Sequence, residues 1–149
     1  MRTVLLLAMG LAGCDGIDRE HVQHRGSVCA YASEGLALRN ASQEPQHFPS
    51  GSSVALSYWA QPRTNDCPLE IYADCRVELG PNPDELIVDA YVAWNEQPGA
   101  LCSREIHAGS AHCVTPVLFK GTYTIVYQDQ RMLLQVPSST TESPCLHQL

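Results

Sequence analysis

The stretch LEIYADCRVEL, residues 69–79, decides the fold of this chain. Its odd positions carry Leu, Ile, Ala, Cys, Val and Leu, whereas its even positions carry Glu, Tyr, Asp, Arg and Glu. Successive side chains of a β-strand point to opposite faces, so a strict period of two predicts a strand with one buried face and one face in water. The chain is therefore expected to build a sheet with a dry side and a wet side.

A second alternating run follows at residues 86–94, LIVDAYVAW. Its buried phase is expected to hold Leu86, Val88, Ala90, Val92 and Trp94. The segment PNPDE at 81–85 separates the two runs and has the composition of a turn. Two strand patterns joined by such a turn predict an antiparallel hairpin.

Other short segments carry weaker strand signals. They lie at 27–32, 54–60, 113–118, 121–127 and 132–136, and QDQR at 128–131 joins the last two in a second hairpin. After the first residues of the chain no segment has the pattern of an amphipathic helix. About seven short strands separated by turns predict an all-β fold, an antiparallel sandwich or barrel.

Residues 118–123, LFKGTY, resemble the L-x-x-G-x-Y turn found before a late strand in immunoglobulin-like domains. The resemblance implies an immunoglobulin-like β-sandwich. It also implies that the hydroxyl of Tyr123 bonds back to the backbone of this corner, with Ile125 and Tyr127 on the same face as the tyrosine.

The chain begins with Arg2 and an uncharged apolar run that ends at Cys14. The run is too short to span a bilayer and has the features of a signal peptide. Leu11-Ala12-Gly13-Cys14 resembles the lipobox of bacterial lipoproteins. The resemblance implies cleavage after Gly13, a diacylglycerol on the Cys14 thiol with acyl chains such as palmitate, and a chain held on a membrane of the bacterial cell envelope, facing the periplasm or the exterior.

These signals divide the chain into four parts. We expect a signal peptide at 1–13, a lipidated polar tether at 14–26, a β-sandwich domain at 27–137, and a polar tail at 138–149 tied back by Cys145. Cleavage would leave 136 of the 149 residues, which suits one domain. His21 and His24, which fall in the tether, are expected to be solvated.

The charge balance restricts the partners. The formal net charge is −7, and loss of Arg2 with the leader would make it −8. Such a charge argues against binding to nucleic acid or electrostatic docking on anionic lipid. The expected partners are the membrane, through the lipid on Cys14, and an envelope protein or glycan. No cofactor is expected.

Besides Cys14 the chain has an even number of cysteines, which in an exported chain predicts three disulfides. The candidates are Cys29, Cys67, Cys75, Cys102, Cys113 and Cys145. A Cys67–Cys75 bridge is disfavoured, because one extended strand would hold the two about 20 Å apart. Cys102–Cys113 across a hairpin is the first choice, and Cys75–Cys113 across the sandwich is the alternative.

No catalytic or metal-binding motif such as G-x-S-x-G, C-x-x-C or H-E-x-x-H occurs. His107 and His112, with Cys102 and Cys113, are the best metal candidates, and imidazole with thiolate suits zinc or copper. A disulfide-closed loop with two exposed histidines is the preferred interpretation of this segment.

Tyr72 and Tyr91 lie on the polar phase of their strands, so both are expected to face outward and to be neighbours. Outward aromatic rings could bind a peptide or a sugar, but cross-strand pairing within the sheet is the preferred explanation of the two tyrosines. The sequence favours a non-catalytic binding or structural module. An envelope metal-binding protein that uses His107 and His112, and an envelope hydrolase with an unrecognised site, are the alternatives.

Overall fold

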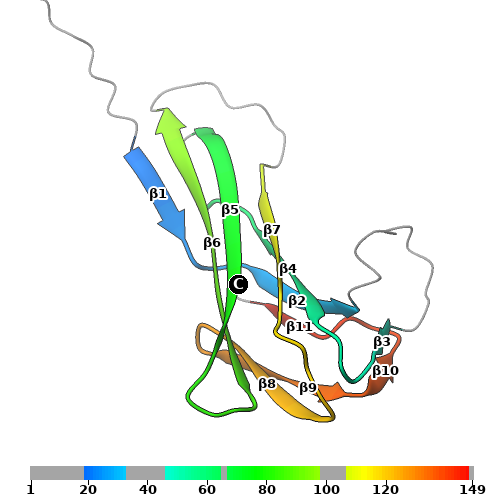
Figure 1. Ribbon diagram of the computed structural model, residues 1–149. Helices are drawn as coiled ribbons and strands as arrows, with labels where there is room; N and C mark the ends of the chain where they lie inside the picture. The colour runs from blue at the N-terminus through cyan, green and yellow to red at the C-terminus, as the bar shows by residue number, and fades with distance from the viewer. Residues whose placement is uncertain (1–18, 33–45, 65–66, 98–106, 148–149) are drawn as a thin grey trace, which may run out of the picture.

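A computed structural model describes residues 19–32, 46–64, 67–97 and 107–147 (Figure 1). Within these ranges the chain forms eleven β-strands and no helix. The described residues accordingly include no helix of the length and hydrophobicity needed to cross a membrane. The all-β class predicted from the sequence is confirmed.

The first sheet is organised around a long hairpin. Strands β5 (Cys67–Leu79) and β6 (Glu85–Gln97) pair antiparallel from Leu79 opposite Leu86 to Cys67 opposite Gln97. An irregularity interrupts the ladder between Leu69 and Tyr72, where Glu70 has a φ of 48°. The predicted hairpin is therefore confirmed, and both strands run farther than their alternating patterns.

Strand β6 is paired on both edges. Strand β5 occupies one of them along its whole length. On the other edge β8 (Gly121–Tyr127) pairs with residues 85–88 and β1 (Arg19–Gln23) pairs with residues 92–96. Strand β9 (Gln130–Val136) completes this sheet as the hairpin partner of β8. The β6–β8 pairing is parallel, which differs from the purely antiparallel expectation. The chain reaches β8 through a strand of the other sheet, so it can enter the first sheet again in the same direction.

The second sheet has the order β11-β2-β4-β7. Its strands are β2 (Ser27–Ala32), β4 (Val54–Ala60), β7 (Gly109–Val114) and β11 (Cys145–His147). A separate two-stranded pair joins β3 (Gln46–Phe48) to β10 (Ser138–Thr140). The strands expected at 27–32, 54–60 and 121–127 are confirmed.

Three differences from the predicted strands stand out. The strand expected at 113–118 was placed wrongly: β7 spans Gly109–Val114, and Pro116 cannot donate to a ladder. Strand β1 lies in the segment predicted as a tether, and β10 and β11 lie in the predicted polar tail. These short strands depend on partners far away in the sequence, which a local pattern does not reveal.

A single hydrophobic core lies between the two sheets. The buried phase predicted for β6 is confirmed, since all five of its side chains belong to this core. On β5 Cys75 is buried, and Ile71, Ala73 and Val77 pack against the core. The ends of the β5 pattern depart from the alternation, because Leu69 is 42% exposed beside the irregularity and Leu79 is 67% exposed beside the turn.

Tyr123 forms the corner that its sequence context predicts. Its Oη accepts a hydrogen bond from the backbone N–H of Phe119 at 3.0 Å and donates to the backbone oxygen of Phe119 at 3.2 Å. Ile125 and Tyr127 follow on the same face of β8 and are fully buried. The side chain of Tyr123 thereby fixes the turn that leads into β8.

Two disulfides are described in full. Cys29 and Cys145 join β2 to β11, with Cα atoms 4.1 Å apart. Cys75 and Cys113 join β5 to β7, with Cα atoms 5.4 Å apart. The first-choice Cys102–Cys113 pairing is therefore wrong and the alternative is correct, because β7 packs beside β5 and so brings Cys113 to Cys75.

Cys67 is also disulfide-bonded, and the four cysteines named above are already paired with one another. A Cys67–Cys75 bridge is thus excluded, as predicted. Cys14 and Cys102 lie outside the described residues.

Candidate binding face

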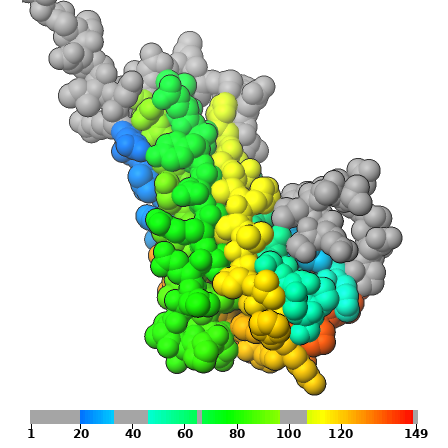
Figure 2. Space-filling view, in the orientation of Figure 1, coloured from blue at the N-terminus to red at the C-terminus, as the bar shows by residue number. Residues whose placement is uncertain are grey.

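The outward side of the first sheet carries an exposed group of aromatic and charged side chains. We call this surface the tyrosine face and define it by the outward positions of β1, β5 and β6 with the adjoining residue His24. Glu70 falls in the irregularity and joins the face through the hydrogen bond that it accepts from Asn95. The residues of the face are Glu20, Val22, His24, Leu69, Glu70, Tyr72, Asp74, Arg76, Glu78, Ile87, Asp89, Tyr91, Ala93 and Asn95. Figure 2 shows the β5–β6 hairpin as a long ridge, with β1 on one side and β7 on the other.

Tyr72 and Tyr91 lie side by side on this face, as the sequence predicts. Their ring centroids are 6.2 Å apart and their planes meet at 83°, an edge-to-face arrangement. Tyr72 is 48% exposed, and Tyr91 is partly exposed. The pair is therefore both a cross-strand contact within the sheet and an aromatic surface open to water.

A hydrogen bond orients the Tyr72 ring. Its hydroxyl donates to Oε1 of Glu20 at 2.7 Å, so the side chain reaches from β5 across β6 toward β1. Ala93 of β6 lies between Val22 and Tyr72 in the register and is fully buried. The hydrogen bond to Glu20 raises the pKa of the Tyr72 hydroxyl above its ordinary value. Tyr72 is therefore held across the sheet and protonated at neutral pH.

His24 extends the aromatic group on the other side of Tyr91. The two ring centroids are 5.8 Å apart, and Nδ1 of His24 lies 3.9 Å from Oδ1 of Asp89. Arg76 Nε donates to Oδ2 of the same Asp89 at 3.0 Å. The sequence places His24 in a tether, and only the pairing of β1 with β6 brings it to this face.

The charges of the tyrosine face are unequal. Arg76 supplies its one guanidinium, whereas five carboxylates belong to it. The acidic side chains are Glu20, Glu70, Asp74, Glu78 and Asp89. With His24 neutral, the formal charge of the face is −4, more than half of the −7 of the whole chain.

His21, which the sequence also places in the tether, lies on the inner side of β1 instead. Its ring stacks on Trp94 with centroids 5.5 Å apart, and its Nε2 lies 3.1 Å from Oε2 of Glu96. The Nε2 atom is shielded from solvent. The Glu96 carboxylate lies close to it, but the contact does not have the alignment of a hydrogen bond. His21 therefore belongs to a strand and not to a tether, and its side chain, 35% exposed, is only partly solvated.

The proposed metal ligands are not brought together with thiolates. Cys113 is bonded to Cys75, and the exposed His112 lies on the opposite face of β7 from Cys113. His107 precedes β7, and Cys102 lies outside the described residues. Among the residues that the structure describes, no group of three or more His, Cys, Asp or Glu side chains could hold a metal ion.

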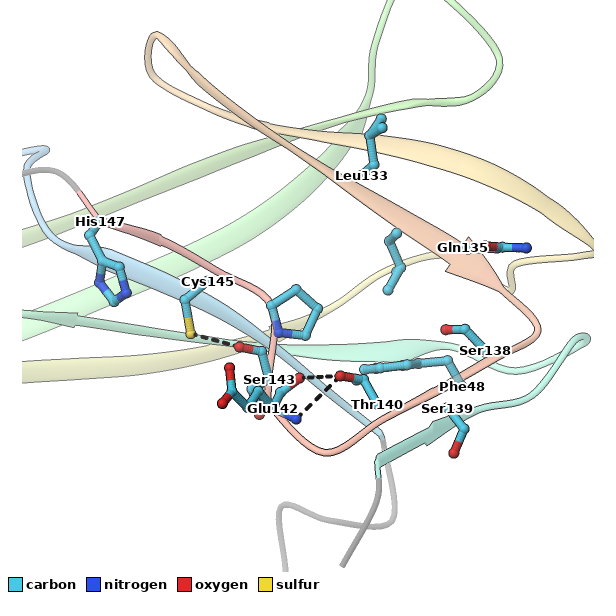
Figure 3. A pocket seen from close by; sticks show the side chains of 12 residues that line it. Phe48, Leu133, Gln135, Ser138, Ser139, Thr140, Glu142, Ser143, Cys145 and His147 are labelled. Atoms are coloured by element: carbon cyan, nitrogen blue, oxygen red, sulfur yellow. Dashed lines mark hydrogen bonds between the residues drawn. The ribbon is translucent and has the colours of Figure 1, made fainter. Parts of the chain in front are cut away.

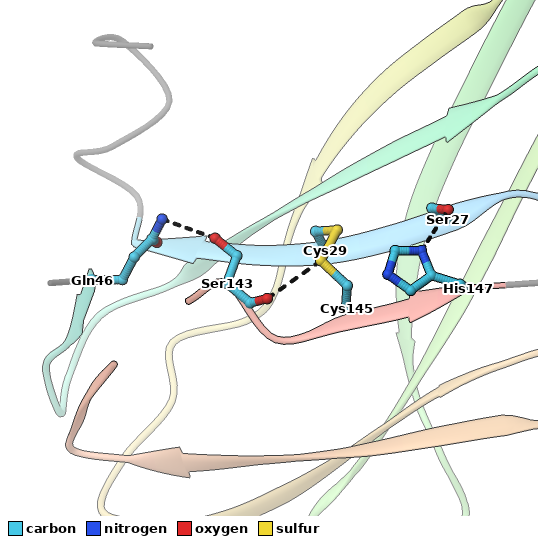
Figure 4. Close-up of a disulfide and its surroundings, with 6 residues drawn as sticks. All are labelled: Ser27, Cys29, Gln46, Ser143, Cys145 and His147. Atoms are coloured by element: carbon cyan, nitrogen blue, oxygen red, sulfur yellow. Dashed lines mark hydrogen bonds between the residues drawn. A yellow bond between two sulfur atoms is a disulfide. The ribbon is translucent and has the colours of Figure 1, made fainter. Parts of the chain in front are cut away.

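A serine and a histidine meet on the second sheet. Ser27 Oγ lies 2.9 Å from Nδ1 of His147, and the two residues are opposite each other in the β2–β11 ladder beside the Cys29–Cys145 bridge (Figure 4). His147 also borders an open hollow of about 590 Å³ between β9 and the segment 138–147 (Figure 3). A serine hydrolase needs a carboxylate that orients the histidine, and among the described contacts no carboxylate pairs with the His147 ring.

Comparison with known proteins adds no relative: no family model, no curated protein and no solved structure matches the chain.

Proposed function

We propose that this chain is a lipid-anchored protein of the bacterial cell envelope, an immunoglobulin-like β-sandwich that acts as a non-catalytic binding module, and that the tyrosine face is its binding surface. Two sheets around one core and the corner made by Tyr123 support the immunoglobulin-like arrangement. The disulfides support export to an oxidising compartment. The lipobox resemblance of residues 11–14 supports a lipid on Cys14.

One observation supports the tyrosine face above the other surfaces. Tyr72 is half-exposed and yet held in one orientation by Glu20 and by the edge of Tyr91. An aromatic side chain that is already ordered loses little conformational freedom when a partner covers it. Such a surface suits recognition, and it contains no nucleophile with an activating base.

Site-directed photo-crosslinking in living cells tests the binding surface. A photoreactive amino acid at position 22 samples the tyrosine face, and the same amino acid at position 110 samples the exposed side of β7 on the other sheet. We expect a discrete crosslinked product from position 22 and none from position 110. Equal products from both positions, or none from position 22, would refute this surface.

The anchor is tested separately. Metabolic labelling with an alkyne analogue of palmitate should label the wild-type chain, and Cys14→Ser should abolish the label and release the chain from the membrane fraction. Cys29→Ser is the matched control, because this cysteine belongs to the β2–β11 bridge and its loss should leave the label. Retention of label in Cys14→Ser would show that Cys14 is not the lipidated residue.

A further inference from the structure

We infer that the tyrosine face binds a cationic polypeptide segment, one that presents lysine or arginine side chains in an extended conformation. This inference rests on the proposed function, because it names the chemistry of the partner at the same surface. The aromatic pair identifies the place, and the distribution of charge identifies the occupant.

Negative charge on the described surface is concentrated on this side of the molecule. The face holds five carboxylates, and its one cation, Arg76, is already committed to Asp89 at 3.0 Å. Asp74 and Glu78 are exposed and stand on either side of Arg76 along β5. Attraction between opposite charges speeds the encounter of two molecules, and repulsion excludes a partner of like charge. This surface therefore favours a cationic chain over an anionic or a neutral one.

The two tyrosines add an aromatic surface on which a cationic side chain can pack, which carboxylates alone do not provide. An ammonium or guanidinium group is attracted to the face of an aromatic ring, and the long stems of lysine and arginine can pack on the same ring. Tyr72 presents its ring within the same row of side chains as Asp74. A basic side chain can therefore contact a ring and a carboxylate together.

The spacing of the face matches an extended segment. Tyr72, Asp74, Arg76 and Glu78 are on one side of β5, where alternate side chains are about 7 Å apart, so Asp74 and Glu78 are about 13 Å apart with Arg76 between them. An extended partner with basic residues four positions apart can reach both carboxylates, and a chain of alternating basic and neutral residues contains that spacing. A neutral sugar could stack on Tyr72, but it would leave the repulsion among the carboxylates unrelieved.

The test is fluorescence anisotropy with a labelled synthetic peptide of alternating lysine and threonine. The protein is the full mature chain with Cys14→Ser, which keeps it in solution. We expect saturable binding that weakens as salt rises from 20 to 300 mM, because the screening length between exposed charges falls from about 20 Å to about 6 Å over that range. A peptide of alternating glutamate and threonine should not bind.

Two double variants separate the charge from the rings. D74N/E78Q should weaken peptide binding about tenfold at low salt, a loss of about 1.4 kcal/mol shared between two exposed charge pairs. Y72L/Y91L should weaken it by a similar factor and leave much of the salt dependence. The control D84N/E142Q removes two exposed carboxylates outside the tyrosine face and should stay within about twofold of the parent. Circular dichroism confirms that each variant is folded.

The outcomes distinguish the two proposals. If D84N/E142Q weakens binding as much as D74N/E78Q, the peptide responds to net charge and the inference is overturned. If an oligosaccharide of N-acetylglucosamine binds in a Tyr72-dependent manner and the lysine peptide does not, the occupant is a glycan. If position 22 crosslinks in cells and neither probe binds, the binding surface stands and the cationic partner is rejected. If position 22 gives no crosslink and no probe binds, both proposals fail.

Discussion

Tyr58 of β4 and Tyr127 of β8 meet edge to face between the two sheets, with ring centroids 6.0 Å apart and planes at 65°. Both hydroxyl groups donate to the same short segment: Tyr58 to the backbone oxygen of Arg25 at 3.1 Å, and Tyr127 to that of His24. This segment carries the chain from β1 in the first sheet to β2 in the second. The pair therefore holds the N-terminal strand, and with it Glu20 and His24 of the tyrosine face, in place.

Removal of either hydroxyl should destabilise the fold. Tyr127→Phe keeps the ring but removes the tyrosine donor to the His24 oxygen. Tyr58→Phe leaves the Arg25 oxygen with Gln23 Nε2 as its donor at 3.0 Å. We expect each substitution to lower the free energy of unfolding by about 1 to 2 kcal/mol, Tyr127→Phe by the larger amount. Urea unfolding with the disulfides intact measures this change. Tyr72→Phe is the matched control, because its hydroxyl is at the surface, and its cost should be below about 0.5 kcal/mol.

The same two tyrosines predict the alkaline limit of the fold. Burial, with a smaller effect of the Asp89 charge, raises the pKa of Tyr127 to about 12, and burial also raises that of Tyr58. A group whose folded-state pKa is raised stabilises the fold fully below its unfolded pKa of about 10, and that stability is lost as the pH rises through the folded value. Stability should therefore fall between about pH 10 and pH 12.

Absorbance of tyrosinate and circular dichroism, recorded together on freshly adjusted samples, test this linkage. Tyr58 and Tyr127 should ionise only as the fold is lost, so the last part of the rise in tyrosinate absorbance should coincide with the loss of circular dichroism. Ionisation of all six tyrosines of the chain in one step near pH 10 without loss of structure would contradict the burial of this pair.

The parts of the fold that local patterns predict are those in which one segment carries its own signal. Alternation over residues 71–77 and 86–94 predicts which side of β5 and β6 is buried, because the two-residue period of a strand is visible in the local sequence. The same alternation puts Tyr72 and Tyr91 on the outer side, and the hairpin makes them neighbours. The corner at Tyr123 is likewise a contact over four residues.

The parts that escaped prediction depend on distant partners. REHVQ at 19–23 has little strand character by itself, and it becomes β1 through pairing with residues 92–96 and the stacking of His21 on Trp94. The Cys75–Cys113 bridge depends on how β7 packs beside β5. His24 and Glu20 therefore reach the tyrosine face through the pairing of β1 with β6, which the local sequence does not reveal.

The close approach of β7 to the β5–β6 hairpin requires glycine at position 109. A Cβ atom on Gly109 would lie 2.6 Å from Cγ2 of Val92 and 3.2 Å from Cβ of Ala73. Gly109→Ala should cost about 1 to 3 kcal/mol in the free energy of unfolding, as overpacked cores do. Gly121→Ala is the control, because the nearest atom to its Cβ would be Cε2 of Tyr123 at 3.8 Å. Equal stability of the two variants would show that β7 and β5 are farther apart.

The last prediction concerns the third disulfide. Cys67 is bonded, and it stands opposite Gln97 at the end of the β5–β6 ladder. Cys102 follows Gln97 by five residues in the sequence, so a Cys67–Cys102 bridge would close the open end of the hairpin. Non-reducing peptide mapping of the chain isolated from cells should recover this bridge together with the two described above, and thiol counting should find no free cysteine.

This experiment also bears on the anchor, because Cys14 is the one other cysteine left for Cys67. A lipid on the Cys14 sulfur forbids a disulfide there, so the anchor and the Cys67–Cys102 bridge are expected together. Recovery of a Cys14–Cys67 peptide from cells would refute both at once. In the Cys14→Ser chain the three bridges should be unchanged, and any free thiol at Cys67 or Cys102 would contradict the predicted pairing.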